Sequence, residues 1–334
     1  MASFDTVSRR TVFAGAAQAA LLAACTRTGA QTEPHTGQPA VKAEPFPLEA
    51  VRLTDSIFLD AVKANRAYLH RLEPDRLLHN FRLYAGLEPK GDIYGGWEGD
   101  TIAGHSLGHY LSAISLMHAQ VGDDELKSRA LYIVDQLAEC QTAGGDGYVA
   151  GFTRKAENGD IEVGRRSMEE IARGDIRPSK FYINGSWAPF YNWHKLFAGL
   201  YDAKLHCGAE NAIPVAEGLA GYIEGVFAPL NDDQVQQVLS CEHGGINESM
   251  AELYALTGNE RWLKLAEHIY HRAVLDPLSQ KRDELSFIHA NTQIPKLIGL
   301  ARLYELTGEA SYDTASRPER LSGRSGSSGC WVNL

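Results

Sequence analysis

Apolar residues recur every three or four positions along most of the chain, which is the spacing of amphipathic helices. One predicted helix face carries Phe58, Ala61, Val62, Tyr68, Leu69 and Leu72, and another carries Leu107, Tyr110, Leu111, Ile114, Met117 and Val121. The apolar-polar alternation of half-buried strands is scarce. The pattern predicts an all-α domain over residues 48–315.

A repeat divides this helical region. The segment Leu253–Trp262 recurs fifty positions later as Leu303–Tyr312, and weaker copies centre on Gly122 and Gly208. In each copy an apolar helix meets a glycine, which readily takes the left-handed conformation that ends helices. An acidic residue, or an Asn, then favours the start of the next helix. Each copy therefore predicts a helical hairpin.

Hairpins that cannot bury their apolar faces alone stack against one another. We expect an (α/α)6-type toroid whose inner helices surround a pocket, with an open solenoid as the alternative. The four hairpin-like units leave the predicted toroid incomplete at its C-terminal side. Residues 143–187 interrupt the rhythm with many glycines, and so long an excursion suggests a rim over a site.

Both ends of the chain differ from the helical region. Residues 1–25 combine a twin-arginine pattern at Arg9-Arg10 with an apolar stretch that ends in Leu22-Ala23-Ala24-Cys25, which is similar to a bacterial lipobox. We expect an exported, periplasmic protein lipidated at Cys25, or alternatively ordinary cleavage and no lipid. Residues 26–47 form a predicted flexible linker. Residues 316–334 have no helical period and suggest an unrelated tail produced by a frameshift.

The composition narrows the class of ligand. A net charge of -10 argues against nucleic acid as a partner, because binding to phosphates needs dense Lys and Arg. Cys140, Cys207, Cys241 and Cys330 form no CxxC pair and do not indicate a disulfide framework. We expect a neutral or weakly charged ligand, contact with a membrane only through the lipid anchor, and no oligomeric state that the sequence can specify.

Histidines are the first candidates for the site. His194, His243 and His289 each lie near the beginning of a predicted helix. In a toroid whose alternate helices line the centre, all three could face one cavity. Neutral imidazole both donates and accepts hydrogen bonds, which suits the hydroxyl groups of a sugar. The alternative for any single histidine is a helix cap or a core position.

Two further segments could contribute to the same pocket. Trp97 and Glu98 lie in a glycine-rich turn, where an exposed indole could stack on a sugar and a carboxylate could accept its hydroxyls. A turn with a buried Trp is the alternative. His105 and His109 share one helix face at a spacing that zinc ligands also use, but no Glu follows His105 as in HExxH. We therefore predict pocket hydrogen bonding or packing for His105, and no metal site.

Ordinary glycosidases use two carboxyl groups, one as acid and the other as nucleophile or base. The candidates are Glu98, Asp100, Glu242 and Glu248. Spacing along the chain cannot place any two of them at the required separation. The catalytic residues therefore stay unassigned.

Several of these segments together resemble glycoside hydrolase family 127, the bacterial β-L-arabinofuranosidases. The resemblance is carried by Gly95–Glu98, Gly104–Ala113, Trp187–Lys195, Cys241–Gly245 and His289–Lys296, in that order. It implies an (α/α)6 catalytic barrel and the hydrolysis of non-reducing terminal β-L-arabinofuranosides from plant glycans. It also implies that His194, His243 and His289 line the sugar subsite.

The same resemblance implies a zinc ion held by cysteines and a glutamate, with a zinc-bound Cys as nucleophile and another Glu as acid/base. Those residues would lie beyond the point where the match ends, so we expect no cofactor in this chain. The leading hypothesis is a truncated, catalytically impaired hydrolase. The alternatives are a non-catalytic, surface-tethered sugar-binding protein, and another (α/α)-barrel enzyme that works with Glu and Asp alone.

Overall fold

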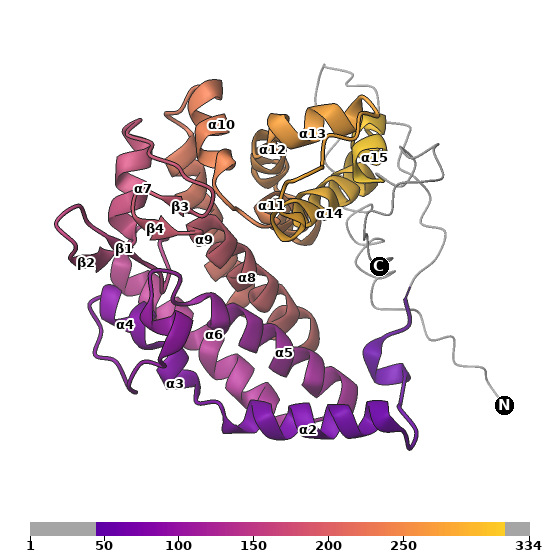
Figure 1. The fold of residues 1–334 in the computed structure, drawn as a ribbon. Coiled ribbons are helices and arrows are strands. Elements are labelled where there is room, and N and C mark those ends of the chain that lie inside the picture. The colour runs from indigo at the N-terminus through magenta and orange to yellow at the C-terminus, as the bar shows by residue number, and fades with distance from the viewer. Residues whose placement is uncertain (1–44, 318–334) are drawn as a thin grey trace, which may run out of the picture. The chain divides into compact units, whose positions relative to one another are not determined.

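The computed structural model describes residues 45–317. The predicted signal, most of the predicted linker, Cys25 and residues 318–334 lie outside this range. Within it, the chain is mainly helical (Figure 1). The helices are α2 (Ile57–Arg71), α3 (Pro74–Leu77), α4 (His79–Tyr84), α5 (His105–Val121), α6 (Asp124–Gly144), α7 (Arg165–Ala172), α8 (Pro189–Asp202), α9 (Ala212–Phe227), α10 (Asp232–Ser240), α11 (Ile246–Thr257), α12 (Glu260–His268), α13 (Arg272–Ser279), α14 (Ala290–Thr307) and α15 (Ala310–Ser316).

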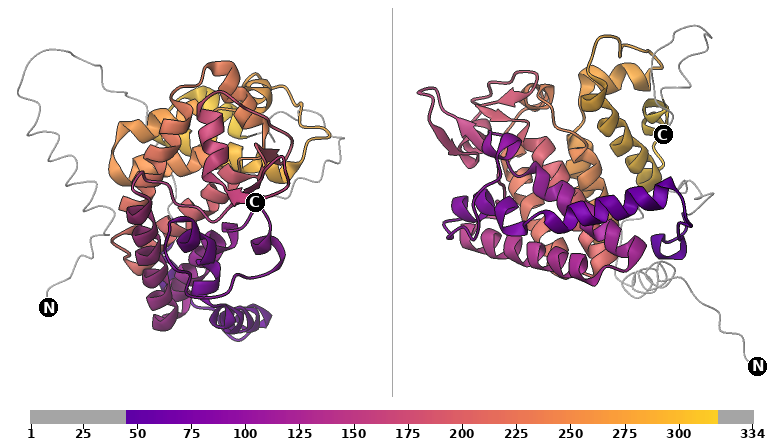
Figure 2. Two further views of the ribbon diagram at one scale, coloured as in Figure 1. Left: turned by 90° about the vertical axis from the view of Figure 1, so that its left-hand side faces the viewer. Right: turned by 60° about the horizontal axis from the view of Figure 1, so that its bottom comes forward.

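Short elements complete the fold. Turns of 3₁₀-helix form η1 (Leu48–Ala50) and η2 (Gly96–Gly99), and a π-helical turn, η3 (Ala203–Cys207), extends α8. Two antiparallel hairpins pair β1 (Thr153–Lys155) with β2 (Ile161–Val163), and β3 (Tyr182–Ile183) with β4 (Ser186–Trp187). The β1–β2 hairpin projects from the helices in Figures 1 and 2. The predicted excursion over residues 143–187 thus contains all four strands of the described residues.

Four helical hairpins dominate the described residues: α5–α6, α8–α9, α11–α12 and α14–α15. The first helices of successive hairpins pack side by side, α5 on α8, α8 on α11 and α11 on α14. We call these four the inner helices. The predicted all-α, toroid-type fold of stacked hairpins is confirmed.

The repeated glycines end helices as the sequence predicted. Gly122, Gly208, Gly258 and Gly308 follow α5, η3, α11 and α14 with φ of 73°, 72°, 71° and 74°. Residues with a side chain are strained in this left-handed conformation, so glycine is favoured there. Asp123 and Asn259 then cap the next helix by accepting hydrogen bonds from the backbone N–H of Leu126 and Arg261.

Glycines also let the inner helices touch backbone to backbone. A Cβ added at Gly108 on α5 would lie 2.3 Å from the carbonyl carbon and oxygen of Lys195 on α8. A Cβ at Gly199 would lie 2.7 Å from the carbonyl oxygen of Gly108. Farther along the row, Gly299 on α14 packs against the side chain of Asn247 on α11. These contacts fix how far each inner helix can slide along its neighbour.

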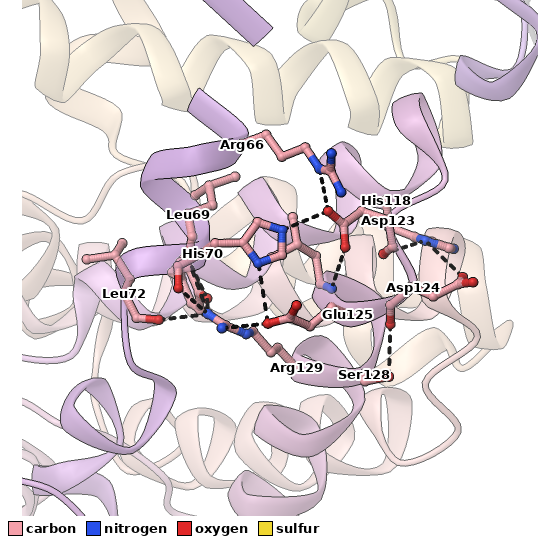
Figure 3. A network of polar contacts seen from close by, with 12 residues as sticks. Arg66, Leu69, His70, Leu72, His118, Asp123, Asp124, Glu125, Ser128 and Arg129 are labelled. Carbon is pink, nitrogen blue, oxygen red and sulfur yellow. Dashed lines mark hydrogen bonds and ion pairs between the residues drawn. The ribbon is translucent and has the colours of Figure 1, made fainter. Parts of the chain in front are cut away.

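Helix α2 is attached by polar contacts (Figure 3). The buried carboxylate of Asp123, between α5 and α6, accepts hydrogen bonds from His70 Nε2 at 2.8 Å and Arg66 Nε at 2.5 Å. Arg129 on α6 donates to the carbonyl oxygens of His70 and Leu72 at 3.0 and 2.9 Å. Arg129 therefore satisfies carbonyl groups that the end of α2 leaves without helical partners.

We predict that Gly108→Ala destabilises the protein by about 2–3 kcal/mol, because the new methyl group must push α5 away from α8. The matched control is Gly225→Ala on α9, where an added Cβ meets nothing within 4 Å. That control should be neutral or more stable by up to about 1 kcal/mol, because Ala favours helix. Urea unfolding of both variants measures the difference, and equal stabilities would contradict the proposed tight α5–α8 contact.

A second prediction concerns pH. Burial alone would raise the pKa of Asp123, but hydrogen bonds from Leu126, His70 and Arg66 outweigh it and hold the pKa well below the usual range. A depressed folded-state pKa stabilises the protein above the unfolded-state pKa of about 4, and this stabilisation is lost as pH falls.

Asp123→Asn should therefore lower the free energy of unfolding by about 2 kcal/mol at pH 7. Its difference from the wild type should become smaller below about pH 4. Asn can still cap α6, so the substitution tests the charge. Asp124→Asn, whose side chain is 93% exposed, is the control and should change stability little. A gap that stays constant from pH 7 to pH 3 would show that the charge of Asp123 is not responsible.

Candidate functional site

The predicted site residues lie at the N-terminal ends of the inner helices. His105 is the first residue of α5, His194 lies in the second turn of α8, His243 precedes α11 and His289 is the N-cap residue of α14. Contacts between the starts of neighbouring inner helices, namely His105–Tyr191, His194–Gly245 and Asn247–Lys296, place residues from the four hairpins on the same side of the row.

The rings of His105, His109 and Tyr191 bring the N-terminal ends of α5 and α8 into contact. The His105 ring centroid lies 5.9 Å from that of His109 and 6.2 Å from that of Tyr191. His109 Nε2 is 3.2 Å from the Tyr191 hydroxyl. Partial burial, followed by the charges of Lys195, His105 and His194, lowers the pKa of His109 to about 4. His109 is therefore neutral at pH 7.

His194 connects α8 to α11. Its Nδ1 accepts a hydrogen bond from the backbone N–H of Gly245 at 3.1 Å, and its Nε2 lies 3.6 Å from a carboxylate oxygen of Glu248. Gly244 and Gly245 give the ring this space, since a Cβ at Gly244 would lie 2.7 Å from Nδ1. Burial lowers the pKa of His194 more than Glu248 raises it. Nδ1 is thus an acceptor, and the neutral ring carries its proton on Nε2.

A second set of basic side chains, those of His243, His271 and Lys296, lies near the starts of α11 and α14. The fully buried His243 pairs through Nδ1 with the carbonyl oxygen of Cys241 at 3.0 Å, and its ring lies 5.7 Å from the ring of His271. Lys296 Nζ lies 2.8 Å from His271 Nδ1. Burial, with help from Lys296, lowers the pKa of His271 to about 3, and burial lowers the pKa of Lys296 to about 7.

Glu242 interacts electrostatically with charged side chains on α8 and at the start of α14. Burial raises its pKa, while the nearby charges of His289, Lys296 and Lys195 lower it. His289 itself is exposed, with its ring 6.1 Å from that of Phe181. We call His105, His109, Tyr191, His194, Glu242, His243, Glu248 and His289 the inner-ring cluster.

Glu98 and Trp97 differ in what they contact. The buried Glu98 carboxylate accepts hydrogen bonds from the N–H groups of Gly104 and Ser106 at 2.8 and 3.3 Å, and lies 3.4 Å from His105 Nδ1. It therefore caps α5 and supports His105. Trp97 is 65% exposed and its ring faces His105 at 5.8 Å. Sugar contact by either residue stays a prediction.

His271 and Lys296 were not predicted as site residues from the sequence. His271 belongs to none of the quoted motifs. Lys296 closes the His289–Lys296 motif, two turns of helix from His289, and this spacing is the signal that could have identified it. Asp100 accepts a hydrogen bond from its neighbour Thr101 in the turn. Among the four candidate carboxylates, only Glu242 and Glu248 belong to the inner-ring cluster.

The described residues do not fit the zinc site that the family resemblance implies. Between residues 45 and 317, no group of three His, Cys, Asp or Glu side chains could hold a metal ion. Cys140, Cys207 and Cys241 are buried and separate, and burial raises the pKa of Cys140 to about 11 and of Cys241 to about 12. In the same range, no helix has the length and apolarity needed to span a membrane.

Comparisons with known proteins identify the family. Residues 50–318 match the model of the β-L-arabinofuranosidase GH127 catalytic domain. Among solved structures, the chain is similar to Ara127N-Se, a GH127 β-L-arabinofuranosidase from Geobacillus stearothermophilus T6, with 17% identity, a TM-score of 0.51, and coverage of 80% of this chain and 44% of that chain.

A second solved structure, the GH127 β-arabinofuranosidase BT3674, gives 19% identity and a TM-score of 0.51, covering 81% of this chain and 42% of that chain. The chain thus spans less than half the length of either structure. No curated protein matches it. The family match covers most of the sequence, so the chain belongs to the GH127 β-L-arabinofuranosidase family.

Proposed function

We propose that the inner-ring cluster binds the non-reducing terminal β-L-arabinofuranosyl unit of a plant-derived glycan. One observation carries the proposal: polar side chains from four successive hairpins converge at the N-terminal ends of the inner helices. A binding site between packed helices is a recurrent arrangement in helical proteins. Family membership supports the choice of sugar.

The chemistry of the cluster suits a neutral sugar. His105, His194 and Tyr191 offer donors and acceptors within one region, and burial keeps His194 neutral. Glu248 can accept hydroxyl protons beside His194. Hydroxyl groups need both donors and acceptors, and a neutral ligand adds no charge to a partly buried site.

We further propose that this chain is catalytically impaired. Glu98 is committed to capping α5, and the three described cysteines are buried thiols that do not act as thiolates near neutral pH. Glu242 and Glu248 are the remaining carboxylates of the cluster. Two competing proposals are a glycosidase that uses these two carboxylates without metal, and a sugar-binding protein with no hydrolytic role.

Location is a separate proposal. The twin-arginine pattern and the lipobox support export to the periplasm and a lipid anchor on Cys25. These residues lie outside the described part of the chain. A lipid anchor would hold the sugar-binding domain at a membrane surface.

We predict that His194→Ala weakens binding of methyl β-L-arabinofuranoside about tenfold or more, because a buried polar contact with the sugar is lost. His268→Ala is the control, since His268 is exposed in the last turn of α12 and its ring lies 6.1 Å from that of Phe227. Isothermal titration calorimetry measures both, and the melting temperature of each variant shows that it folds. Equal affinities for His194→Ala and the wild type would remove His194 from the sugar site.

We also predict no detectable release of p-nitrophenol from its β-L-arabinofuranoside, with or without added zinc and thiol. We expect the protein to bind the sugar and not to hydrolyse it. Turnover that persists in EDTA and disappears in Glu242→Gln would instead favour the two-carboxylate glycosidase. Turnover that depends on zinc would contradict the proposed impairment.

A further inference from the structure

Three aromatic side chains form a row beside the inner-ring cluster. Ring centroids of Trp97 and Trp187 are 6.3 Å apart, and those of Trp187 and Tyr182 are 5.6 Å apart. We call these three residues the aromatic ladder. They come from η2, β4 and β3, so separate segments of the chain build one feature.

The β3–β4 hairpin sets the position of two ladder residues. Tyr182 and Trp187 are directly opposite partners in its register, which brings their side chains together on one face. Asn184 and Gly185 form the two-residue turn with φ of 50° and 83°, a conformation that Asn-Gly favours. The hairpin thus presents Tyr182 and Trp187 as a pair.

The hairpin is firmly anchored. The Asn184 side chain donates hydrogen bonds to Glu170 Oε2 and to the carbonyl oxygen of Asp175, both at 2.8 Å. The Lys155 N–H of β1 donates to the Gly185 carbonyl oxygen at 2.9 Å. A platform fixed before binding loses less conformational entropy when it takes up a ligand.

The ladder is also accessible. Trp97 is 65% exposed, Tyr182 is 43% exposed and Trp187 is partly exposed. Adjacent exposed aromatic rings leave apolar surface in water, and such surfaces commonly mark binding sites. The planes of Tyr182 and Trp187 are tilted by 32°, and the planes of Trp97 and Trp187 are inclined by 65°, so the three rings form a row of aromatic contacts and not one flat surface.

The ladder continues from the inner-ring cluster. Trp97 contacts the His105 ring at 5.8 Å, and Trp187 lies two residues before α8, which carries Tyr191 and His194. A glycan whose terminal unit occupies the cluster would reach the ladder with its next units. Apolar faces of sugar rings stack on aromatic rings, and no charged ligand is needed.

We infer that the aromatic ladder is a second binding subsite, for the sugar units that follow the terminal arabinofuranose, and that the ligand is an oligosaccharide. This inference rests on the proposed function. Trp187 and Tyr182 thereby become specificity-determining residues for chain length.

The test compares two ligands by calorimetry: methyl β-L-arabinofuranoside and a β-linked L-arabinofuranose trisaccharide. The wild type should bind the trisaccharide about tenfold more tightly, as expected for one or two stacking contacts. Tyr182→Ala should lose most of this preference while keeping the affinity for the methyl glycoside, because Tyr182 is the ladder residue that connects to the cluster only through Trp187 and Trp97. Tyr68→Ala on α2, whose side chain is similarly exposed at 49%, is the matched control and should keep it.

The outcomes separate the two proposals. If the wild type binds both ligands equally, or if Tyr182→Ala keeps the preference, the ladder is not a subsite and the proposed function is unaffected. If neither ligand binds to the wild type, both proposals fail. Tryptophan fluorescence gives a second readout, since the trisaccharide should shift the emission of the wild type more than the methyl glycoside does, and this difference should shrink in Tyr182→Ala.

Discussion

The backbone contact between α5 and α8 is the constraint on which the site depends. Gly108 and Gly199 let the two helices approach until carbonyl groups lie where side chains would otherwise stand. Asn247 and Gly299 pack α11 against α14 in the same row. Interiors are packed closely enough that such contacts resist sliding. The N-terminal ends of the inner helices are therefore held level, and residues from distant hairpins meet there.

This arrangement creates an electrostatic problem that the side chains resolve. Helix N-terminal ends carry partial positive charge, and several of them converge here. Burial keeps His194, His243 and His271 neutral, so they do not add to that charge. The carboxylates of Glu98 and Glu248 lie at the starts of α5 and α11, where negative charge is favoured. The result is a polar region of the kind that the proposed neutral sugar would need.

The sequence predicted those features that depend on local conformation. Helix periodicity and the glycines at 122, 208, 258 and 308 depend on nearby residues, and the observed turns follow them. Features that depend on tertiary contacts could not be predicted from the sequence. His271 becomes a neighbour of His243 only when the start of α13 comes close to the segment before α11, and Glu98 becomes a helix cap only because η2 folds back onto Gly104.

The cluster and the ladder differ in how their affinity would arise. Polar contacts in the cluster replace hydrogen bonds to water, so their net contribution is modest, but they discriminate strongly between hydroxyl arrangements. Aromatic stacking in the ladder buries apolar surface and tolerates variation in the stacked unit. In the proposed binding mode, the inner helices would recognise the terminal sugar. The glycine-rich excursion, held by hydrogen bonds of Asn184 and of β1, would add affinity for the sugar units that follow it.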